Sequence, residues 1–425
     1  MSDEVRRRTP RRLRRLLSPG RQRAVWSWIA AQASGLRRRR AEKRLTIGVD
    51  INSFYEPLTG VGWYLRQILA HLADRPDLRL RLYGDALLDD DPKAAPHVPP
   101  PDGAALEWVR FDPRQAPFIY HGAAARAVRA LAPLLVAWDR NDVLWAPNYL
   151  LPRLFRFARG SRVATIHDLA SRKLPHTVRP DTLRALDARL SAALAEADAL
   201  IVPSEAVRAD LAALAGVPPA KIHAIHHGLG STAAAEPARM PAGVAPPFGL
   251  HVGTLEPRKN LDVLLAAWRA LRERHPEARL VLAGGPGWHG EATQAEIRRG
   301  IAEGWLTAPG YVGADQLAAL YGAATLVAVP SLDEGFGLAA VEALAAGAPL
   351  AASDIPVLRE VAGEAACYAP PQDISAWTEV LERLWADGAL QDEMRRRGRA
   401  RSRDFDWQRA ADETAAVLRA AAGRR

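Results

Sequence analysis

Short apolar runs alternate with longer segments of helical spacing along residues 45–400, and this alternation constrains the fold more than any other feature. The strand-like runs are 45–50, 78–84, 142–146, 162–166 and 199–203, then 248–253, 278–283, 325–329 and 349–352. The predicted helices are 62–73, 179–197 and 205–215, then 260–274, 314–322, 336–346 and 374–387. This order is typical of βαβ units and parallel sheets, so we predict an α/β protein.

The alternation occurs in two blocks, and a chain of 425 residues is too long for one ordinary domain. A stretch at 232–247 is rich in proline, alanine and glycine, as expected of a linker. We therefore predict an N-terminal domain at 45–240 and a C-terminal domain at 245–400. A last helix near 404–421 is expected to pack back on the first domain.

Cysteine content and hydropathy limit the class of protein. The one cysteine, Cys367, excludes a disulfide framework and fits a reducing compartment. No apolar run approaches the roughly 20 residues that span a bilayer, and no secretory cleavage site is evident. We expect a cytoplasmic protein. No H-E-x-x-H spacing is present, and cysteine cannot supply a zinc site.

The positive charge is concentrated in an N-terminal extension, residues 1–44. This extension holds 15 basic and three acidic residues, a net charge of +12, whereas the rest of the chain holds 42 basic and 45 acidic residues. A short apolar island with Trp26, Trp28 and Ile29 interrupts the arginines. Tryptophan favours membrane interfaces and arginine binds anionic headgroups, so we predict docking on an anionic membrane. The alternative is a solvated basic extension.

The strongest chemical signal is residues 330–349, which read PSLDEGFGLAAVEALAAGAP. The apolar run 325–329 places Glu334 at the carboxyl end of a strand, and Gly335 and Gly337 permit close approach of backbone N–H groups to a ligand. Glu342 follows about two turns into the next helix, among apolar neighbours. One carboxylate can face a sugar while the other accepts from ribose hydroxyls. The alternative is two ordinary solvated acids.

The spacing P-S-x-x-E-G-F-G-L followed by E-A-L-A-x-G-x-P resembles the signature of the retaining group 1 (family 4) glycosyltransferases. The resemblance covers most of residues 45–400 and is strongest at 250–370. It implies the GT-B fold, with two facing Rossmann-like domains, parallel sheets and an interdomain cleft, here with a basic N-terminal extension. It also implies that Glu334 contacts the donor sugar and that Glu342 binds the ribose of the nucleotide.

Residues 251–261, HVGTLEPRKNL, follow the first strand of the second block. Two adjacent cations, Arg258 and Lys259, suit a leaving diphosphate, although two solvated cations before a helix are the alternative. The resemblance favours the diphosphate. Many relatives carry arginine directly after Gly253, where this chain has Thr254, so Arg258 is expected to supply that charge.

Further candidates lie in glycine turns. LAGGPG at 282–287 follows a strand and suits either a phosphate or a plain turn, and YVG at 311–313 lies against the nucleobase in relatives, although core packing is equally natural. The N-terminal LTGVGWY at 58–64 resembles the family's glycine loop. The predicted nucleotide-sugar contacts, beside Glu342, are Gly60, Gly62, Gly253, Thr254, Gly285, Val312, Gly335, Phe336, Gly337 and Leu338.

A His-Asp pair, His167 and Asp168, directly follows the strand-like run 162–166. Relatives have a histidine here that touches the transferred sugar, so His167 joins Glu334, Lys259 and Arg258 as a predicted catalytic residue, with Asp168 orienting its ring. The alternative is a structural histidine. Ser204 is first of all a helix N-cap, and residues 226–228, His-His-Gly, resemble the family's turn before the linker.

The family resemblance implies a retaining hexosyltransferase. The H-D-L of residues 167–169 and the V-G-T-L-E-P-R-K-N of residues 252–260 resemble those of bacterial mannosyltransferases of surface-polysaccharide assembly. This resemblance implies mannose from GDP-mannose as the preferred donor and a glycan or lipid-linked acceptor. No isolated acid in the first domain suits a covalent nucleophile, which favours front-face departure of the diphosphate with concerted attack. No D-x-D motif is present, and we expect no metal, no cofactor and no nucleic-acid partner. Three alternatives stay open: an epimerase or phosphorylase on this fold, a nucleic-acid-binding protein acting through the extension, or a non-catalytic sugar-binding subunit.

Overall fold

The computed structural model describes residues 44–54, 60–84, 103, 105–110, 132–134, 136–148, 151–178, 180–230, 239–287 and 290–423. The predictions for the basic extension, apart from Arg44, lie outside these residues. Contacts divide the chain into two compact units, Met1–Ala164 with Leu418–Arg425 and Thr165–Val417. These contact units are divided at residues 164–165 and 417–418, whereas the sequence predicted a domain boundary at 240–245. The predicted domain boundary stays a prediction.

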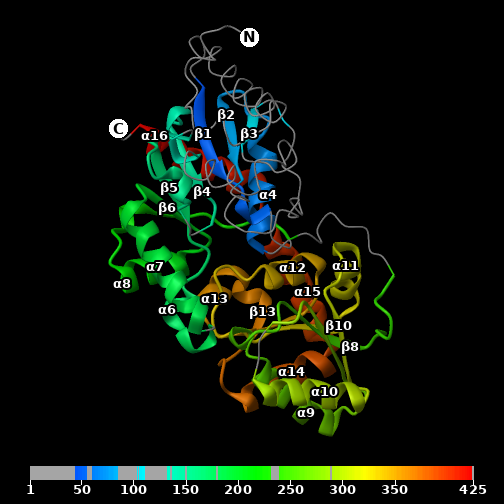
Figure 1. Ribbon diagram of the computed structural model, residues 1–425. Helices are drawn as coiled ribbons and strands as arrows, with labels where there is room; N and C mark the ends of the chain where they lie inside the picture. Colours follow the sequence, from blue (N-terminus) through cyan, green and yellow to red (C-terminus); the bar gives the residue numbers. More distant parts are fainter. Residues whose placement is uncertain are drawn as a thin grey trace, which may run out of the picture. The chain divides into compact units, whose positions relative to one another are not determined.

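The first sheet has the strand order β3-β2-β1-β4-β5-β6-β7, and neighbouring strands such as β1 and β2 run parallel (Figure 1). Its strands are β1 (Leu45–Asp50), β2 (Leu78–Tyr83), β3 (Leu106–Arg110), β4 (Val143–Ala146), β5 (Ser161–Thr165), β6 (Ala199–Val202) and β7 (Ile222–Ala224). β1 lies inside this order and is almost wholly buried, as its apolar run predicts.

The second sheet is parallel throughout, with the strand order β10-β9-β8-β11-β12-β13. Its strands are β8 (Phe248–Val252), β9 (Arg279–Ala283), β10 (Leu306–Gly310), β11 (Leu326–Val329), β12 (Leu350–Ser353) and β13 (Ala366–Ala369). Strands β8 and β11 are neighbours at its centre. The loops that follow them therefore meet at one edge, where ligands of parallel α/β sheets bind.

Helices cover both faces of the second sheet (Figure 1). On one face lie α9 (Leu261–Arg274), α10 (Glu291–Ala302) and α14 (Ile374–Ala386). On the other lie α11 (Ala314–Ala323), α12 (Leu338–Ala346) and α13 (Pro356–Ala362), with α15 (Gly388–Ser402) against α12. Because both faces are buried, Leu280 and Leu282 of β9 join one core and Val281 and Ala283 join the other.

The remaining helices are α4 (Gly60–Leu72), α6 (Ala170–Lys173), α7 (Pro180–Glu196), α8 (Glu205–Ala215) and α16 (Trp407–Ala422). α4 begins at Gly60, so Gly60 and Gly62 form its first turn and not a loop ahead of it. α16 ends in the first unit, where Arg419 Nη2 lies 2.6 Å from Asp77 Oδ2.

Candidate active site

Glu334 is the centre of a buried polar cluster at the carboxyl end of β11. Its Oε1 accepts hydrogen bonds from Lys259 Nζ at 2.6 Å and Ser331 Oγ at 2.7 Å, and its Oε2 accepts from Arg258 Nη1 at 3.1 Å. The carboxylate is therefore paired with both cations of the loop after β8. The structure brings together three of the four predicted catalytic residues.

The charges of this cluster are mutually stabilised. Burial opposes ionisation of Glu334, but Lys259 and Arg258 outweigh it and hold the pKa of this carboxyl at about 2. Burial also opposes the charge of Arg258, and Glu334 outweighs it, so the pKa of the guanidinium is raised above its ordinary value. Glu334 is thus an anion and Arg258 a cation throughout the physiological pH range.

Backbone contacts fix the two loops that carry these groups. The short 3-10 helix η7 (Pro257–Lys259) ends at Asn260, which adopts a left-handed φ of 56°. The Asn260 side chain donates to the Pro330 carbonyl at 3.0 Å and the Pro371 carbonyl at 2.6 Å. The Leu332 N–H donates to the Arg258 carbonyl at 2.9 Å. The loops after β8 and β11 therefore hold each other in register.

Arg258 is oriented by more than Glu334. Its Nη2 donates to Glu256 Oε1 at 2.6 Å, and its Nη1 donates to the Asp333 carbonyl at 2.8 Å. The guanidinium therefore lies on the Glu334 loop. This position suits the expectation that Arg258 supplies the charge that Thr254 lacks, and that role stays a prediction.

Glycine is needed at positions 335 and 337 of the motif for different structural reasons. A Cβ on Gly335 would lie 1.8 Å from the His167 carbonyl oxygen, so the close approach of two backbones requires glycine there. The same segment is held by Ser204 Oγ, which donates to the Gly335 carbonyl at 2.8 Å. Gly337 has a φ of +84° and is the N-cap of α12, a helix start without a side-chain cap. The start of α12 thus presents backbone N–H groups, as an anion site requires.

Glu342 lies in α12, but nearer its start than the sequence suggested. The helix begins at Leu338, so Glu342 is little more than one turn inside it, and the prediction of about two turns was wrong. The residues just after Glu334 form loop because Gly337 takes a left-handed conformation. The Glu342 carboxylate is buried and accepts a hydrogen bond from Tyr321 Oη at 3.0 Å.

The turn after β9 combines a tight backbone contact with an open position. A Cβ on Gly284 would lie 1.9 Å from the Gly253 carbonyl oxygen, whereas a Cβ on Gly285 would meet nothing within 4 Å. Gly284 is therefore a packing glycine. Gly285 leaves room for a ligand, as the phosphate hypothesis needs. In the next loop Val312 is partly buried against the core, while Tyr311 is 73% exposed.

His167 lies beside the Glu334 loop through its backbone contact with Gly335. Its ring is 5.9 Å from the ring of His227, which in turn lies 4.9 Å from the ring of Phe336. Asp168 Oδ1 accepts from the Ala170 N–H at 3.1 Å, at the start of α6. Orientation of the His167 ring by Asp168 stays a prediction. Ser204 is confirmed as an N-cap, since its side chain accepts from the Val207 N–H.

Three contributors to this site were missed by sequence reasoning. Ser331 was quoted within the motif but given no role, although it hydrogen-bonds Glu334. Lys173 Nζ lies 2.5 Å from Asp333 Oδ1 and 2.6 Å from Asp210 Oδ2. Tyr321 hydrogen-bonds Glu342. The sequence signal for these contacts was limited to Ser331 and to Asp333, the partner of Lys173, because both residues lie inside the motif.

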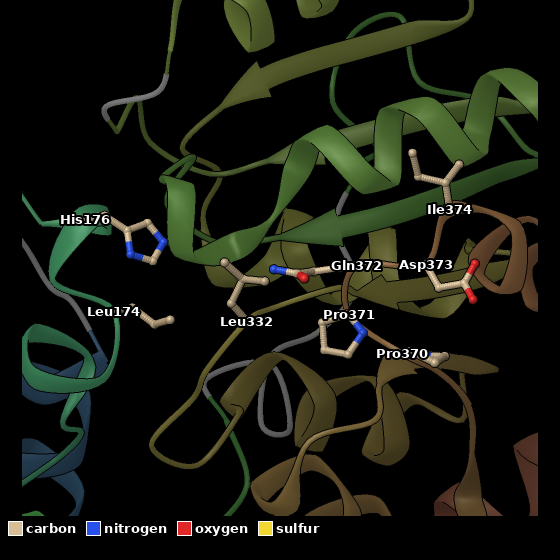
Figure 2. Close-up of a pocket in the computed structure, with 8 residues that line it drawn as sticks. All are labelled: Leu174, His176, Leu332, Pro370, Pro371, Gln372, Asp373 and Ile374. Atoms are coloured by element: carbon tan, nitrogen blue, oxygen red, sulfur yellow. The ribbon is translucent and has the colours of Figure 1, made fainter.

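An open groove of roughly 720 Å³ adjoins the Glu334 loop. Figure 2 shows Leu174 and His176 on one side of the groove and residues 370–374 on the other. Leu332 lies between these two sides. The volume is in the range of ligand sites. Within the described residues no group of three or more His, Cys, Asp or Glu is placed to hold a metal ion, and no helix is long and apolar enough to cross a membrane.

Two parallel sheets, with this cluster at the strand ends of the second, define a protein of the GT-B class. The chain is structurally similar to sucrose-phosphate synthase from Thermosynechococcus elongatus, with a TM-score of 0.66 and 23% identity over 89% of this chain and 99% of that one. It is also similar to Anabaena HepE, solved in complex with UDP and glucose, with a TM-score of 0.64 and 18% identity over 89% of this chain and 100% of that one.

Sequence comparison is more specific. "Glycosyl transferases group 1" matches residues 246–387, and "Glycosyl transferase 4-like domain" matches residues 59–228. The O-antigen chain mannosyltransferase B of Escherichia coli is 30% identical over 84% of this chain and 95% of its own length. A glycogen synthase of Mycobacterium tuberculosis is 32% identical over 66% of this chain and 69% of its own length. The chain therefore belongs to the group 1 glycosyltransferase family, and the predicted family and GT-B fold are confirmed.

Proposed function

We propose that this glycosyltransferase is a retaining mannosyltransferase that transfers mannose from GDP-mannose to a glycan or lipid-linked acceptor of a cell-surface polysaccharide. The E. coli O-antigen chain mannosyltransferase B, which matches over nearly its whole length, supports mannose as the transferred sugar and a polysaccharide chain as the acceptor. The glycogen synthase matches over a smaller share of both chains. HepE, whose structure holds UDP and glucose, supports a nucleotide-sugar donor in general.

The observation that carries the proposal is the pairing of Glu334 with both Arg258 and Lys259. A leaving diphosphate develops negative charge, and two adjacent cations with a helix N-terminus are suited to stabilise it. In the proposed reaction the cations turn toward the diphosphate while Glu334 holds the donor sugar. His167 contacts the sugar from the adjoining loop. The groove beside Leu332 is large enough for part of an acceptor.

The proposed step is a front-face substitution. The bond between the anomeric carbon and the diphosphate oxygen breaks, and the acceptor hydroxyl attacks from the same face as its proton passes to the departing diphosphate. The protein supplies position and charge stabilisation, and the proposal includes no metal and no cofactor.

The test of the donor is thermal unfolding in the presence of GDP, UDP, ADP and their sugars. A ligand at 100 times its Kd adds about 2.7 kcal/mol to the free energy of unfolding, so the melting temperature should rise by a few degrees for GDP and GDP-mannose. If the melting temperature rises only with UDP or only with ADP, the donor carries that nucleotide and the assignment of GDP-mannose is wrong. No rise with any nucleotide would reject the donor site.

The test of stereochemistry uses water as the acceptor. GDP-α-mannose is incubated with enzyme and the first mannose released is followed by proton NMR before the anomers equilibrate. Retention predicts α-mannose as the first product. β-Mannose would contradict the proposed reaction.

We also propose a cytoplasmic location with peripheral binding to the inner face of the plasma membrane through residues 1–44. The support is the charge of +12 and the tryptophan island of that segment. Full-length protein should pellet with anionic vesicles at low salt and be released at high salt. A chain starting at Arg44 should stay in solution yet bind nucleotide. Equal pelleting of both chains would contradict the proposal.

A further inference from the structure

The buried acid of α12 is held by a residue that no motif includes. Tyr321 of α11 donates from its hydroxyl to Glu342 Oε2 at 3.0 Å, and its side chain is fully buried. A longer contact of 3.3 Å joins the same hydroxyl to the Ala339 carbonyl. Because a phenol has one proton and the distance to the charged acceptor is shorter, we assign the hydrogen bond to Glu342.

The phenol remains a donor at every working pH. Burial, reinforced by the adjacent Glu342, raises the pKa of Tyr321 well above its ordinary value. Tyr321 therefore keeps its proton and presents it to the carboxylate. A buried carboxylate with such a donor loses less freedom on binding a ligand than a mobile one does.

A second contact fixes the same carboxylate from another direction. A Cβ on Gly230 would lie 2.0 Å from Glu342 Oε1 and 2.2 Å from its Cγ. Glycine at 230 therefore lets the backbone lie directly against the carboxylate. Any larger residue would displace the Glu342 side chain from the position that Tyr321 sets.

We propose that Tyr321 and Gly230 are positioning residues that hold the Glu342 carboxylate in the orientation that reads the ribose hydroxyls of the donor nucleotide. This inference rests on the proposed function, in which Glu342 binds ribose. It adds the means by which the site selects a ribonucleotide. A fixed carboxylate can accept from the 2′- and 3′-hydroxyls together, whereas a 2′-deoxynucleotide offers it only one of them.

The experiment compares GDP with 2′-deoxy-GDP by isothermal titration, in the wild type, Tyr321→Phe, Gly230→Ala and Glu342→Ala. Tyr321→Phe removes one hydroxyl and keeps the ring. We expect its Kd for GDP to rise roughly tenfold, in line with loss of a hydrogen bond to a charged group, and its Kd for 2′-deoxy-GDP to change less than twofold. KM for GDP-mannose should rise in parallel while kcat stays within twofold of the wild type. Gly230→Ala should show the same pattern.

The matched control is Tyr368→Phe. Tyr368 donates its hydroxyl proton to the Gly363 carbonyl at 2.7 Å, and the Leu358 carbonyl oxygen lies 3.2 Å from the same hydroxyl. Its variant therefore removes a partly buried tyrosine hydroxyl of the same unit that has backbone partners. It should leave the ratio of the two Kd values unchanged. If Tyr321→Phe does not fold, as judged by its melting temperature, Gly230→Ala carries the test.

The outcomes separate the two ideas. If Glu342→Ala abolishes the preference for ribose while Tyr321→Phe and Gly230→Ala keep it, the positioning role is wrong and the donor site stands. If Glu342→Ala keeps the preference, or the wild type has none, the ribose role of Glu342 fails and the positioning role fails with it. Loss of the preference in all three variants supports the proposal.

Discussion

The motif at residues 330–349 buries one carboxylate in the loop after β11, here called the loop end, and one in helix α12, here called the helix end. The two carboxylates are held in different ways. Glu334, in the loop, and Glu342, in the helix, are each 8% exposed and lie eight residues apart. Glu334 is paired with two cations, Arg258 and Lys259. Glu342 accepts from a neutral phenol and lies against the backbone of Gly230.

The difference indicates a division of labour. The cations paired with Glu334 can turn toward the departing diphosphate, so the loop end suits the chemical step. A carboxylate positioned by a phenol hydroxyl and lying against a glycine backbone suits hydrogen bonds from neutral hydroxyls, so the helix end suits recognition. This comparison predicts that the loop end controls turnover and the helix end controls affinity.

The largest expected effect is at the loop end. Glu334→Ala should lower turnover about 100-fold, the usual scale for removing one group that stabilises a transition state. Initial rates at saturating donor measure it. Glu256→Ala is the matched control, because Glu256 also pairs with Arg258, and it should lose much less. Wild-type turnover in Glu334→Ala would remove the loop end from the chemistry.

Lys259 is the next test of the loop end. Lys259→Ala should cut turnover at least about tenfold, because a charge-assisted contact to a leaving group is worth roughly 1.5–3 kcal/mol. Lys259→Arg should restore part of the rate. Lys221→Ala removes a lysine that donates to the Leu194 carbonyl and should have no effect on turnover. An unchanged rate for Lys259→Ala at saturating donor would contradict the assignment.

The pKa of buried His251 tests whether water is excluded from the loop end. Burial is the main cause that lowers the pKa of His251 to about 4, and its Nδ1 lies 3.0 Å from the Ala328 carbonyl oxygen. The unfolded chain binds this proton below about pH 6.5, whereas the folded chain does so only below about pH 4. Stability is therefore lost as pH falls through this window.

The corresponding variant is His251→Leu, which does not titrate. Between pH 7 and pH 5 the wild type should lose about 2 kcal/mol more free energy of unfolding than the variant. Urea unfolding at the two pH values measures the difference. Equal losses in the two proteins would show that His251 is hydrated and that the loop end is wetter than the geometry indicates.

The smallest expected effect concerns the lysine that braces the loop. Lys173→Met breaks the bridge from Asp210 to Asp333, beside Glu334, and should lower turnover about threefold with GDP affinity unchanged. Lys173→Arg should restore it. Arg172→Met removes the neighbouring cation, which pairs with Asp187, and serves as the control. An equal loss in both variants would indicate a general effect on α6.

The fold was predictable from sequence where strands are buried on both sides. The predicted run at 45–50 matches β1, and 325–329 contains β11. Four strands were missed, and all are sheet edges: β3, β7, β10 and β13. An edge strand has one neighbour and needs less apolar sequence, as in LEWVR of β3 and LTAPG of β10. Helices α6, α10, α13 and α15 were also missed, and α15 is so polar that it shows little apolar periodicity.

Within the site, the motif residues could be predicted but their partners could not. Residue types and spacing identified Glu334, Glu342, Arg258 and Lys259. Lys173 meets Asp333 across 160 positions of sequence, and Tyr321 meets Glu342 from another helix. Only the packing of the fold brings such pairs together, because no local pattern connects them.

The different roles of the two acids are tested most directly by measuring turnover and affinity in Glu334→Ala and Glu342→Ala side by side. Initial rates at saturating GDP-mannose give turnover, and titration with GDP gives Kd. We expect opposite effects in the two variants. Glu334→Ala should lose turnover while its Kd for GDP stays within about threefold of the wild type or tightens, because its cations are released. Glu342→Ala should bind GDP roughly tenfold more weakly with turnover largely kept. The same pattern in both variants, or wild-type values in both, would contradict the division of labour between the two acids.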